Sequence, residues 1–440
     1  MKASTTHSLS HQEIQAYYEQ YVNPWQVEEA RLHGIADWEM THATGMHLFT
    51  REGKEIVDFM AGSSMLNLGH NHPRILKARR WYNEKKGMEV WKTFLSPYLA
   101  ALSHNLAALS PDDLCYPFFC NSGSEAIEGA LKIASKYQGK RKKCVVYTDA
   151  SSHGSTHAAL SISGAETVAR SYHRLLDDCV SIPFGNWQAF EQVIVERGGK
   201  RNDIVAIVTE AICSNGVLIP PDDYLPKLRE LCDTYKILLI VDEVSNGLGR
   251  TGKMFSFEHA VVTPDIYTIA KSLGGGKCST AAYVARKRIF RRAYGSLNDS
   301  TLHTTTFNGF GEESVTALEC LNILVDEQLV ENAQKLGEHL QQGLRALVES
   351  YPQWIREVRG IGLLAAIEFL PIKGKRSTLD ELYEGFPTGR VIYHLLHKHQ
   401  TLTFARSARR DCLHISPPLI VSKIQIDSFL QALDEVLLRL

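Results

Sequence analysis

The stretch ILLIVDEV at residues 237–244 begins with five consecutive aliphatic residues. Two acidic residues and a valine follow them. An unbroken aliphatic run of this length is typical of a strand that is buried on both faces of a parallel sheet. Helical patterns lie between several similar runs, which span 143–149, 204–210, 265–270 and 280–285. The alternation of short apolar strands with helices predicts an α/β fold, in which helices cover a mainly parallel sheet.

The C-terminal part of the chain has a different character. Residues 313–326 and 328–349 have amphipathic helical patterns, a strand-like run follows at 358–369, and a last helix is expected over 422–440. These patterns predict a separate, smaller α+β domain at 326–440.

The N-terminal part contains a hairpin pattern at 45–62, with alternating residues around a glycine-containing turn. We expect this hairpin to pair with the sheet of the small domain. The chain would then comprise an N-terminal segment 1–64 that joins the small domain, a large domain 65–325, and the C-terminal small domain.

Composition excludes several classes of protein. With 44% hydrophobic and 22% charged residues, this chain of 440 residues has the composition of a globular protein with a sizeable core. Its 48 lysines and arginines nearly balance its 49 aspartates and glutamates, so we expect neither nucleic acid nor a membrane as a partner.

Cysteine usage and the absence of targeting signals bear on the compartment. The nine cysteines are scattered and never spaced C-x-x-C, and no H-E-x-x-H pair occurs, so we expect no disulfide framework and no metal site. The first thirty residues lack the features of a signal peptide, and no apolar run is long enough to span a bilayer. We therefore expect a cytoplasmic protein.

Two charged residues follow predicted strands. Lys271 precedes a glycine triplet, and an amine held there can be desolvated and reactive, although a solvated lysine at a strand boundary is the simpler interpretation. Asp242 ends the most apolar strand, where a carboxylate is costly unless it meets a cation or hydrogen-bond donors. A protonated pyridine nitrogen is one such partner. A helix cap and a divalent metal are the alternatives.

Two further segments are candidates for phosphate binding. NSGSEA (121–126) places small and hydroxylated residues at a predicted helix start, where free N–H groups and the helix dipole favour an anion. The same residues also fit an ordinary capping box, through Ser122 and Glu125. HTTTFNG (303–309) supplies threonines in a turn-rich segment, as a second possible phosphate contact.

The order of the characteristic segments resembles that of the class-III (subgroup II) aminotransferases of fold type I, which bind pyridoxal 5′-phosphate (PLP). The resemblance covers about residues 25–440 and includes GHNHP (69–73), NSGSEA (121–126), DEVSNGLGRTG (242–252), AKSLGGG (270–276), HTTTFNG (303–309) and PPLI (417–420). It implies a large PLP-binding domain, a small α+β domain and an obligate homodimer with shared active sites.

The resemblance also assigns roles to residues. Lys271 is the lysine that forms a Schiff base with PLP and moves the proton, and Asp242 is the partner of the pyridine nitrogen. Glu210 lies above the substrate side of the site. Thr306 reaches the cofactor phosphate of the neighbouring subunit. The other cofactor-binding positions that it implies are Ser122, Gly123, Ser124, His153, Gly154, Val244 and Ser245.

The chain departs from the family pattern at several positions. Ser152 takes the place of an aromatic residue that stacks on the ring, so that stacking must come from elsewhere, and His153 is one candidate. Ser245 replaces a glutamine. His414 replaces the arginine that clamps a substrate carboxylate, and a neutral imidazole does not reproduce a guanidinium fork. The nearby arginines that could substitute for it are Arg406, Arg409 and Arg410.

These features predict an aminotransferase that moves an amino group between a primary amine and a carbonyl acceptor. Because His414 lacks the clamp, we expect a donor whose amine is remote from a carboxylate, namely a diamine, an ω-amino acid or a biosynthetic amine. The alternatives are a PLP-dependent aminomutase or racemase on the same scaffold, and a non-enzymatic binding subunit.

Overall fold

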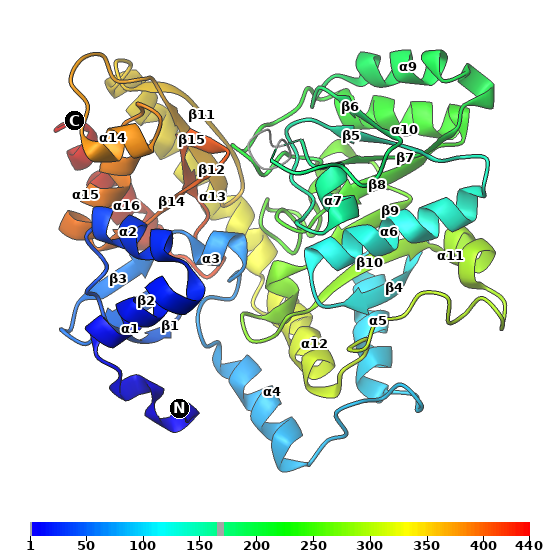
Figure 1. Ribbon diagram of the computed structural model, residues 1–440, viewed down its shortest axis with the longest axis horizontal. Helices are drawn as coiled ribbons and strands as arrows, with labels where there is room; N and C mark the ends of the chain where they lie inside the picture. The colour runs from blue at the N-terminus through cyan, green and yellow to red at the C-terminus, as the bar shows by residue number, and fades with distance from the viewer. Residues whose placement is uncertain (1, 165–170) are drawn as a thin grey trace.

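The computed structural model of the protein describes residues 2–164 and 171–440. It forms two lobes, with a large sheet and its covering helices on the right of Figure 1 and two smaller sheets on the left. Within the described residues, no helix has the length and apolarity needed to cross a bilayer.

The large sheet has seven strands in the order β4-β10-β9-β8-β7-β5-β6. Strands β5 to β9 pair in parallel, whereas β10 is antiparallel to both of its neighbours, so the predicted mainly parallel sheet is confirmed. The strands are β4 (Leu114–Cys120), β5 (Cys144–Thr148), β6 (Cys179–Ile182), β7 (Ile204–Thr209), β8 (Leu238–Asp242), β9 (Ile266–Ile269) and β10 (Ala281–Arg286).

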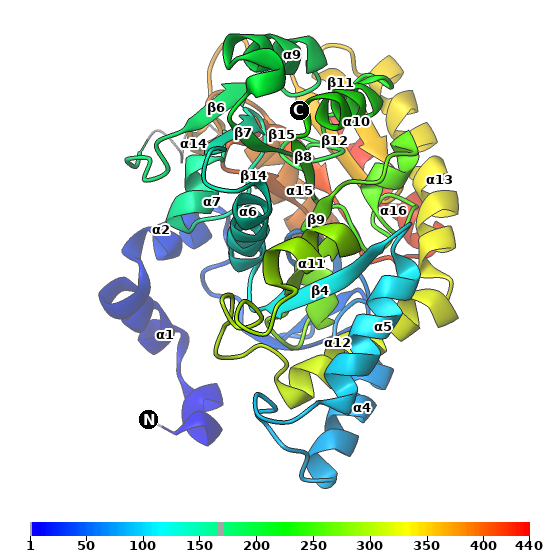
Figure 2. The same ribbon diagram turned by 90° about the vertical axis from the view of Figure 1, so that its right-hand side faces the viewer.

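The aliphatic run in β8 is continuous because helices bury both faces of the sheet. Leu238 and Ile240 belong to a buried cluster that includes residues of α6 (Gly123–Gln138), α7 (His157–Ser161) and α11 (Lys287–Tyr294). Leu239 and Val241 point to the opposite cluster. That cluster contains residues of α5 (Pro97–Leu109), α9 (Trp187–Glu196), α10 (Tyr224–Tyr235) and α12 (Gly311–Asp326). Figure 2 shows α6 and α11 in front of the sheet.

The other lobe contains an antiparallel sheet of four strands in the order β11-β12-β15-β14. Its strands are β11 (Ile355–Ile361), β12 (Leu364–Phe369), β14 (Phe404–Arg406) and β15 (Arg409–Ile415). Its helices are α13 (Leu329–Ser350), α14 (Thr378–Leu382), α15 (Thr388–His399) and α16 (Lys423–Leu437). The predicted helices and the strand pattern of the C-terminal part are thus present in the structure.

The N-terminal hairpin is present but pairs differently from the prediction. β2 (His47–Thr50) and β3 (Glu55–Asp58) form the antiparallel hairpin, and β1 (Met40–Thr44) precedes them. β3 pairs in parallel with the short β13 (Thr401–Leu402) rather than with the four-stranded sheet, so these strands form a separate sheet. The division into 1–64, 65–325 and 326–440 stays a prediction.

The remaining helices precede or connect these sheets. They are η1 (Ala3–Ser8), α1 (His11–Tyr17), η2 (Tyr18–Val22), α2 (Pro24–Leu32), α3 (Ala61–Ser64), α4 (Pro73–Glu84), η3 (Gly199–Arg201), η4 (Ser256–Ala260) and η5 (Lys271–Gly274).

Candidate active site

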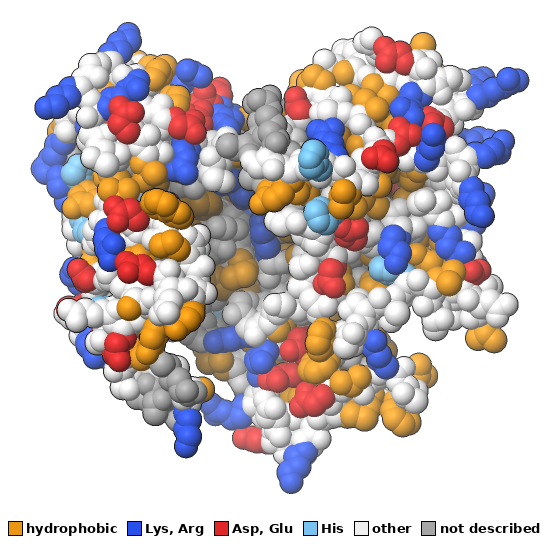
Figure 3. Space-filling model, viewed as in Figure 1, with side chains coloured by type: hydrophobic (Ala, Val, Ile, Leu, Met, Phe, Trp, Pro, Cys, Tyr) orange, Lys and Arg blue, Asp and Glu red, His pale blue; other side chains and the backbone are white. Residues whose placement is uncertain are grey.

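The candidate site lies at the carboxyl ends of two neighbouring strands, where ligands of open α/β sheets bind. Asp242 is the last residue of β8, and Lys271 begins η5 directly after β9 and Ala270. Both line one cavity of about 360 Å³. Figure 3 shows the molecule hollowed between the two lobes.

The cavity brings together residues that are far apart in the sequence. The predicted cofactor residues among its lining are Ser122, Gly123, Ser124, His153, Gly154, Asp242, Val244, Ser245 and Lys271. The residues that the sequence reasoning did not select are Met65, Asn121, Ala270, Cys278, Ser279 and Thr280. The glycine triplet at 274–276 was the available signal for the last three, because a chain reversal there returns the next residues to the cavity.

Lys271 has a strained backbone and a buried amine. Its φ of 47° lies in the left-handed region, which L-residues rarely adopt outside turns and functional sites. The Nζ atom donates a hydrogen bond to Ser245 Oγ at 2.5 Å. Burial and then the positive charge of Arg406 lower the pKa of Lys271 to about 8. The neutral, nucleophilic amine is therefore accessible near neutral pH.

Asp242 is held by three donors. Its Oδ1 accepts hydrogen bonds from the Val244 N–H at 2.9 Å and the Thr268 hydroxyl at 3.0 Å. Its Oδ2 lies 2.7 Å from His153 Nδ1. His153 is buried, and its Nε2 has no partner among the described residues. His153 thus positions the Asp242 carboxylate through a bond at its ring edge.

The N-terminus of α6 forms a close-packed wall of the cavity. Ser122 is the N-cap, and its Oγ accepts from the Glu125 N–H at 3.2 Å, so the expected capping role is present. Gly154 has a φ of 140°, and a Cβ there would lie 2.2 Å from Ser124 Oγ. Only glycine allows this approach. The wall therefore presents backbone N–H groups at a helix N-terminus, which favours a phosphate.

Glu210 lies outside the cavity lining but close enough to affect its charge. It is buried directly after β7, and its Oε1 accepts from the Ser214 N–H at 3.0 Å. Its Oε2 has no partner among the described residues. Burial, and then the negative charge of Asp242, raise the pKa of Glu210.

His414 also lies outside the cavity lining. It is fully buried on β15, and its Nε2 bonds to the backbone oxygen of Ser214 at 3.0 Å. Burial and then the positive charge of Arg406 lower the pKa of His414 well below its ordinary value, so the imidazole is neutral. The substrate-binding role of His414 stays a prediction.

Arg406 is the arginine that lines the cavity, at the end of β14. Its Nε and Nη2 are buried and have no partner among the described residues. Burial lowers the pKa of Arg406, and the nearby Glu210 charge opposes that shift. A guanidinium with unsatisfied buried donors is suited to bind a carboxylate.

The other two arginines considered from the sequence have other partners. Arg410 lies 5.5 Å from the centre of the Tyr383 ring. Arg409 pairs with Glu368 at 2.6 Å and with Asp411 at 2.9 Å.

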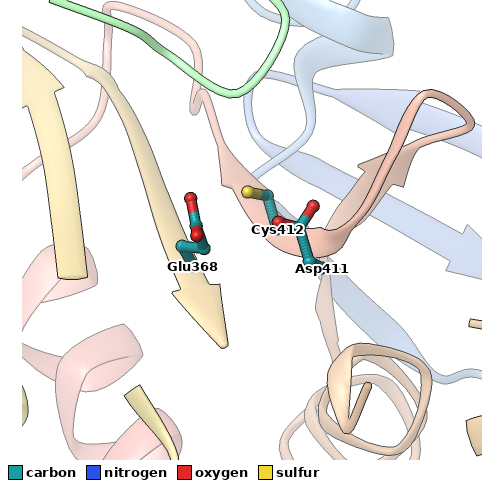
Figure 4. A group of neighbouring side chains, drawn as sticks. All are labelled: Glu368, Asp411 and Cys412. Carbon is teal, nitrogen blue, oxygen red and sulfur yellow. The ribbon is translucent and has the colours of Figure 1, made fainter. Parts of the chain in front are cut away.

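The two carboxylates that hold Arg409 belong to a group that resembles a metal site. Figure 4 shows Glu368, Asp411 and Cys412, whose ligand atoms lie within 4.8 Å of one another. Arg359 also pairs with Glu368, at 2.8 Å. Arginine side chains therefore neutralise this group.

Thr306 lies in a second cavity, which adjoins the first. This cavity of about 660 Å³ shares Asn121, Ser122 and Ser279 with the first, and its other lining residues are Glu125, Thr305, Thr306, Phe307, Phe310 and Glu313. Thr306 therefore lies near the Ser122 end of α6 in its own chain, and its contact with a neighbouring subunit stays a prediction.

The donor set of the first cavity fits PLP. The helix N-terminus fits its phosphate, Asp242 fits a protonated ring nitrogen, and the Lys271 amine fits its aldehyde. Ser152 is exposed at the rim, where the family pattern has an aromatic residue.

Comparisons with known proteins bear on the family and the fold. The family model for class-III aminotransferases matches residues 30–437. A transaminase from the marine bacterium Virgibacillus is 27% identical, with a TM-score of 0.85, over 96% of this chain and 98% of that chain. The ornithine aminotransferase of Toxoplasma gondii ME49 is 25% identical, with a TM-score of 0.85, over 100% and 99%.

A third similar structure is a thermostable (S)-enantioselective omega-transaminase from Thermomicrobium roseum. It is 26% identical, with a TM-score of 0.85, over 98% of this chain and 99% of that chain. Another structure of the Toxoplasma gondii enzyme is described with PLP at its active site. The fold of this chain is thus that of transaminases of PLP fold type I.

Proposed function

The chain belongs to the class-III aminotransferases, and from this premise we propose that Lys271, Asp242 and Arg406 carry out amino-group transfer in the cavity beyond β8 and β9. The protein is a PLP-dependent aminotransferase. The observation that carries the proposed site is the placement of the Lys271 amine, the Asp242 carboxylate and the α6 N-terminus around one cavity.

The chain's own residues have distinct tasks. Lys271 would hold the cofactor through its Nζ atom, and the same amine, once released, would take the proton from the substrate carbon that bears the amino group. When bound, PLP supplies an electron sink for the charge left by that proton. Asp242, oriented by His153, holds a proton on the ring nitrogen. Ser122, Gly123 and Ser124 bind the phosphate, with Gly154 packed against them.

Three further positions have supporting roles. Val244 lines the cavity beside Gly123, where its side chain would pack against the cofactor ring. Ser245 accepts the Lys271 hydrogen bond and so orients the amine. Glu210 holds a proton more readily than an ordinary carboxyl, which limits negative charge beside Asp242.

The substrates are a primary amine and a carbonyl acceptor, at least one of which carries a carboxylate. We infer that Arg406, rather than His414, binds this carboxylate, because Arg406 lines the cavity with two unpartnered nitrogen atoms. A neutral His414 does not favour an α-carboxylate, whereas Arg406 supplies a cation that can bind one. The donor remains a diamine, an ω-amino acid or a biosynthetic amine. The aminomutase or racemase alternative has no support in the structures compared, which are described as transaminases or as an aminotransferase.

A homodimer with shared active sites is supported by apolar side chains around the second cavity. Residues 88–95 and 297–307 expose Leu95 at 98%, Leu297 at 92% and Phe94 at 64%. The Gly311 N–H bonds to the Glu89 carbonyl at 2.9 Å, so the first of these segments lies beside Phe310, which lines the second cavity. Such apolar surface beside Thr306 suits an interface through which a second copy reaches the cavity.

A reducing, cytoplasmic location is supported by the cysteines. All nine are free, and six of them are buried. Their chemistry suits a compartment that keeps thiols reduced.

Borohydride reduction of the holoenzyme, followed by peptide mapping, tests the assignment of Lys271. The label should appear on Lys271 and be lost in Lys271→Ala, with Lys277→Ala, a nearby lysine outside the cavity lining, as the control. A label on a different lysine would show that the proposed site is wrong, although the family would be unaffected.

A further inference from the structure

A third cavity lies at the opposite end of the large sheet from Lys271. Its volume is about 620 Å³, and its lining residues are Tyr137, Gln138, Arg229, Cys232, Asp233, Lys236, Ile237, Leu238, Asp265, Arg286, Arg288 and Arg292. β8 and β9 begin beside it, and β10 ends beside it, so three strands run between this cavity and the active site. Its volume is within the range of small-molecule sites.

The cavity has more cationic than anionic side chains. Five of its lining residues are arginine or lysine, and two are aspartate. Arg229 forms ion pairs with Asp265 at 2.9 Å and with Asp233 at 2.7 Å, so both aspartates of the lining have a cationic partner. Arg286 forms an ion pair at 2.8 Å with Asp113, which does not line the cavity. These two arginines are structural.

The other three cations, Lys236, Arg288 and Arg292, are exposed, so they can reach a ligand. Arg288 shares Asp265 with Arg229, and half of its side chain is exposed. Lys236 and Arg292 are exposed, and within the described part of the chain neither has a carboxylate at ion-pair distance. Arg229 in addition has a buried Nε without a partner among the described residues.

An aromatic ring holds in place the two arginines of α11 that line the cavity. Arg288 donates to the Tyr137 hydroxyl at 2.9 Å, and the Arg292 guanidinium lies 4.8 Å from the centre of the same ring. Planar guanidinium groups fixed in this way are pre-organised to bind phosphate oxygen atoms in pairs. The sequence reasoning did not find this feature, because its residues come from α6, α10, α11 and three strand ends.

Further positive charge surrounds the opening. Residues 140–143, which follow α6, read KRKK, and α11 contributes Lys287 and Arg291 besides the two lining arginines. Figure 3 shows Lys and Arg side chains along the right-hand edge, where Figure 1 places α11 and the end of α6. Because the whole chain has a formal charge of −1, this positive charge is local and raises the concentration of anions at the cavity.

We propose that this cavity binds a small molecule with a phosphate or polyphosphate group, held by Arg288, Arg292 and Lys236. The site is separate from the PLP phosphate site, which lies beyond the other ends of the same strands. A nucleoside polyphosphate fits both the volume and the number of exposed cations.

Calorimetric titration of the PLP-loaded enzyme tests the proposal, because PLP then occupies the active-site phosphate position. ATP and pyrophosphate should each bind at one site per chain, adenosine should not bind, and the affinity should fall with added salt. Arg292→Gln should weaken pyrophosphate binding at least about tenfold, because it removes a charge-assisted interaction.

Arg291→Gln is the matched control, because Arg291 is an exposed neighbour on α11 that does not line the cavity. It should leave binding within about twofold, and neither variant should change the rate of amino transfer. The double variant Lys236→Gln/Arg292→Gln should lose more affinity than Arg292→Gln. Absence of saturable binding of both phosphates, or equal losses in Arg291→Gln and Arg292→Gln, would overturn the proposal.

Discussion

Lys271 and Arg406 place two cationic side chains at one cavity, and each affects the other. The Arg406 charge adds to burial in lowering the pKa of Lys271 to about 8. A lysine without these influences titrates at about 10.4. The arginine that is proposed to bind the substrate carboxylate therefore also increases the fraction of Lys271 amine that is neutral at a given pH.

The pH dependence of cofactor attachment follows from this lowered pKa. Only the neutral amine is nucleophilic, so the rate at which the apoprotein attaches PLP should rise with pH through about 8 and level off above it. In Arg406→Gln the midpoint should move to higher pH, because one of the causes of the lowered pKa is removed. Stopped-flow absorbance measures both profiles. A wild-type midpoint near 10 would contradict the described surroundings of the amine.

Arg406→Gln should also separate substrates by their charge. We expect kcat/KM for a carboxylate-bearing partner to fall by about two orders of magnitude, the value of a partly buried charge-assisted pair, and by less than about threefold for an amine without a carboxylate. Arg410→Gln is the control, because Arg410 lies over the Tyr383 ring. Equal losses for both substrate classes would assign Arg406 a structural role instead.

At the scale of elements, the sequence predicts the central strands well and the edges poorly. β5, β7, β8, β9 and β10 were expected from their apolar runs, because helices cover both faces there. β4 was missed because it contains Pro117 and several partly exposed residues, and β6 because only one of its four residues is buried. Both are edge strands, where half-burial weakens the pattern.

The candidate site was also predicted from the sequence only in part. Lys271, Asp242 and Ser122 follow strands or begin a helix, and strand direction alone brings such positions to one edge of the sheet. Arg406 could not be chosen over Arg409 from the sequence. That choice depends on the carboxylates of Glu368 and Asp411, which engage Arg409 from β12 and β15.

The packing of Gly154 against α6 can be tested for its effect on PLP binding. Gly154→Ala would place a Cβ 2.2 Å from Ser124 Oγ in a backbone conformation that favours glycine. We expect the Kd for PLP to rise at least about tenfold, because the phosphate wall must open.

Gly139→Ala, at the other end of α6, is the control. Gly139 also has a positive φ, of 81°, but a Cβ there meets nothing within 4 Å. It should cost about 1 kcal/mol of stability and leave PLP affinity unchanged. A Gly154→Ala enzyme with wild-type affinity, measured by fluorescence titration, would contradict the proposed phosphate wall.

At the scale of the whole molecule, Arg250 connects the two lobes. It is fully buried after β8, and it donates to the Leu363 carbonyl at 3.1 Å, to Asn67 Oδ1 at 2.6 Å and to the Pro417 carbonyl. Burial lowers the pKa of Arg250 to about 9. Its bonds hold the segment that follows Asp242 against the lobe that contains Arg406.

The proposed shared sites predict complementation between inactive variants. Lys271→Ala should lack the reacting amine, and Thr306→Ala should bind PLP weakly. If Thr306 acts on the neighbouring subunit, a mixed dimer has one site with both residues intact, and activity should return in part after subunit exchange. Mass spectrometry of intact dimers verifies the exchange. Verified exchange without recovered activity would indicate that Thr306 serves its own chain.

The central claim is that Lys271 moves an amino group between two substrates, and isotope transfer tests it most directly. A ¹⁵N-labelled primary amine and a keto acid are incubated with the PLP-loaded enzyme, and mass spectrometry follows the label. The account predicts that ¹⁵N appears in the amino acid formed from the keto acid, one for one with the carbonyl product, in the wild type and in Lys277→Ala but not in Lys271→Ala. Turnover of the amine without added keto acid, or label transfer by Lys271→Ala at the wild-type rate, would contradict it.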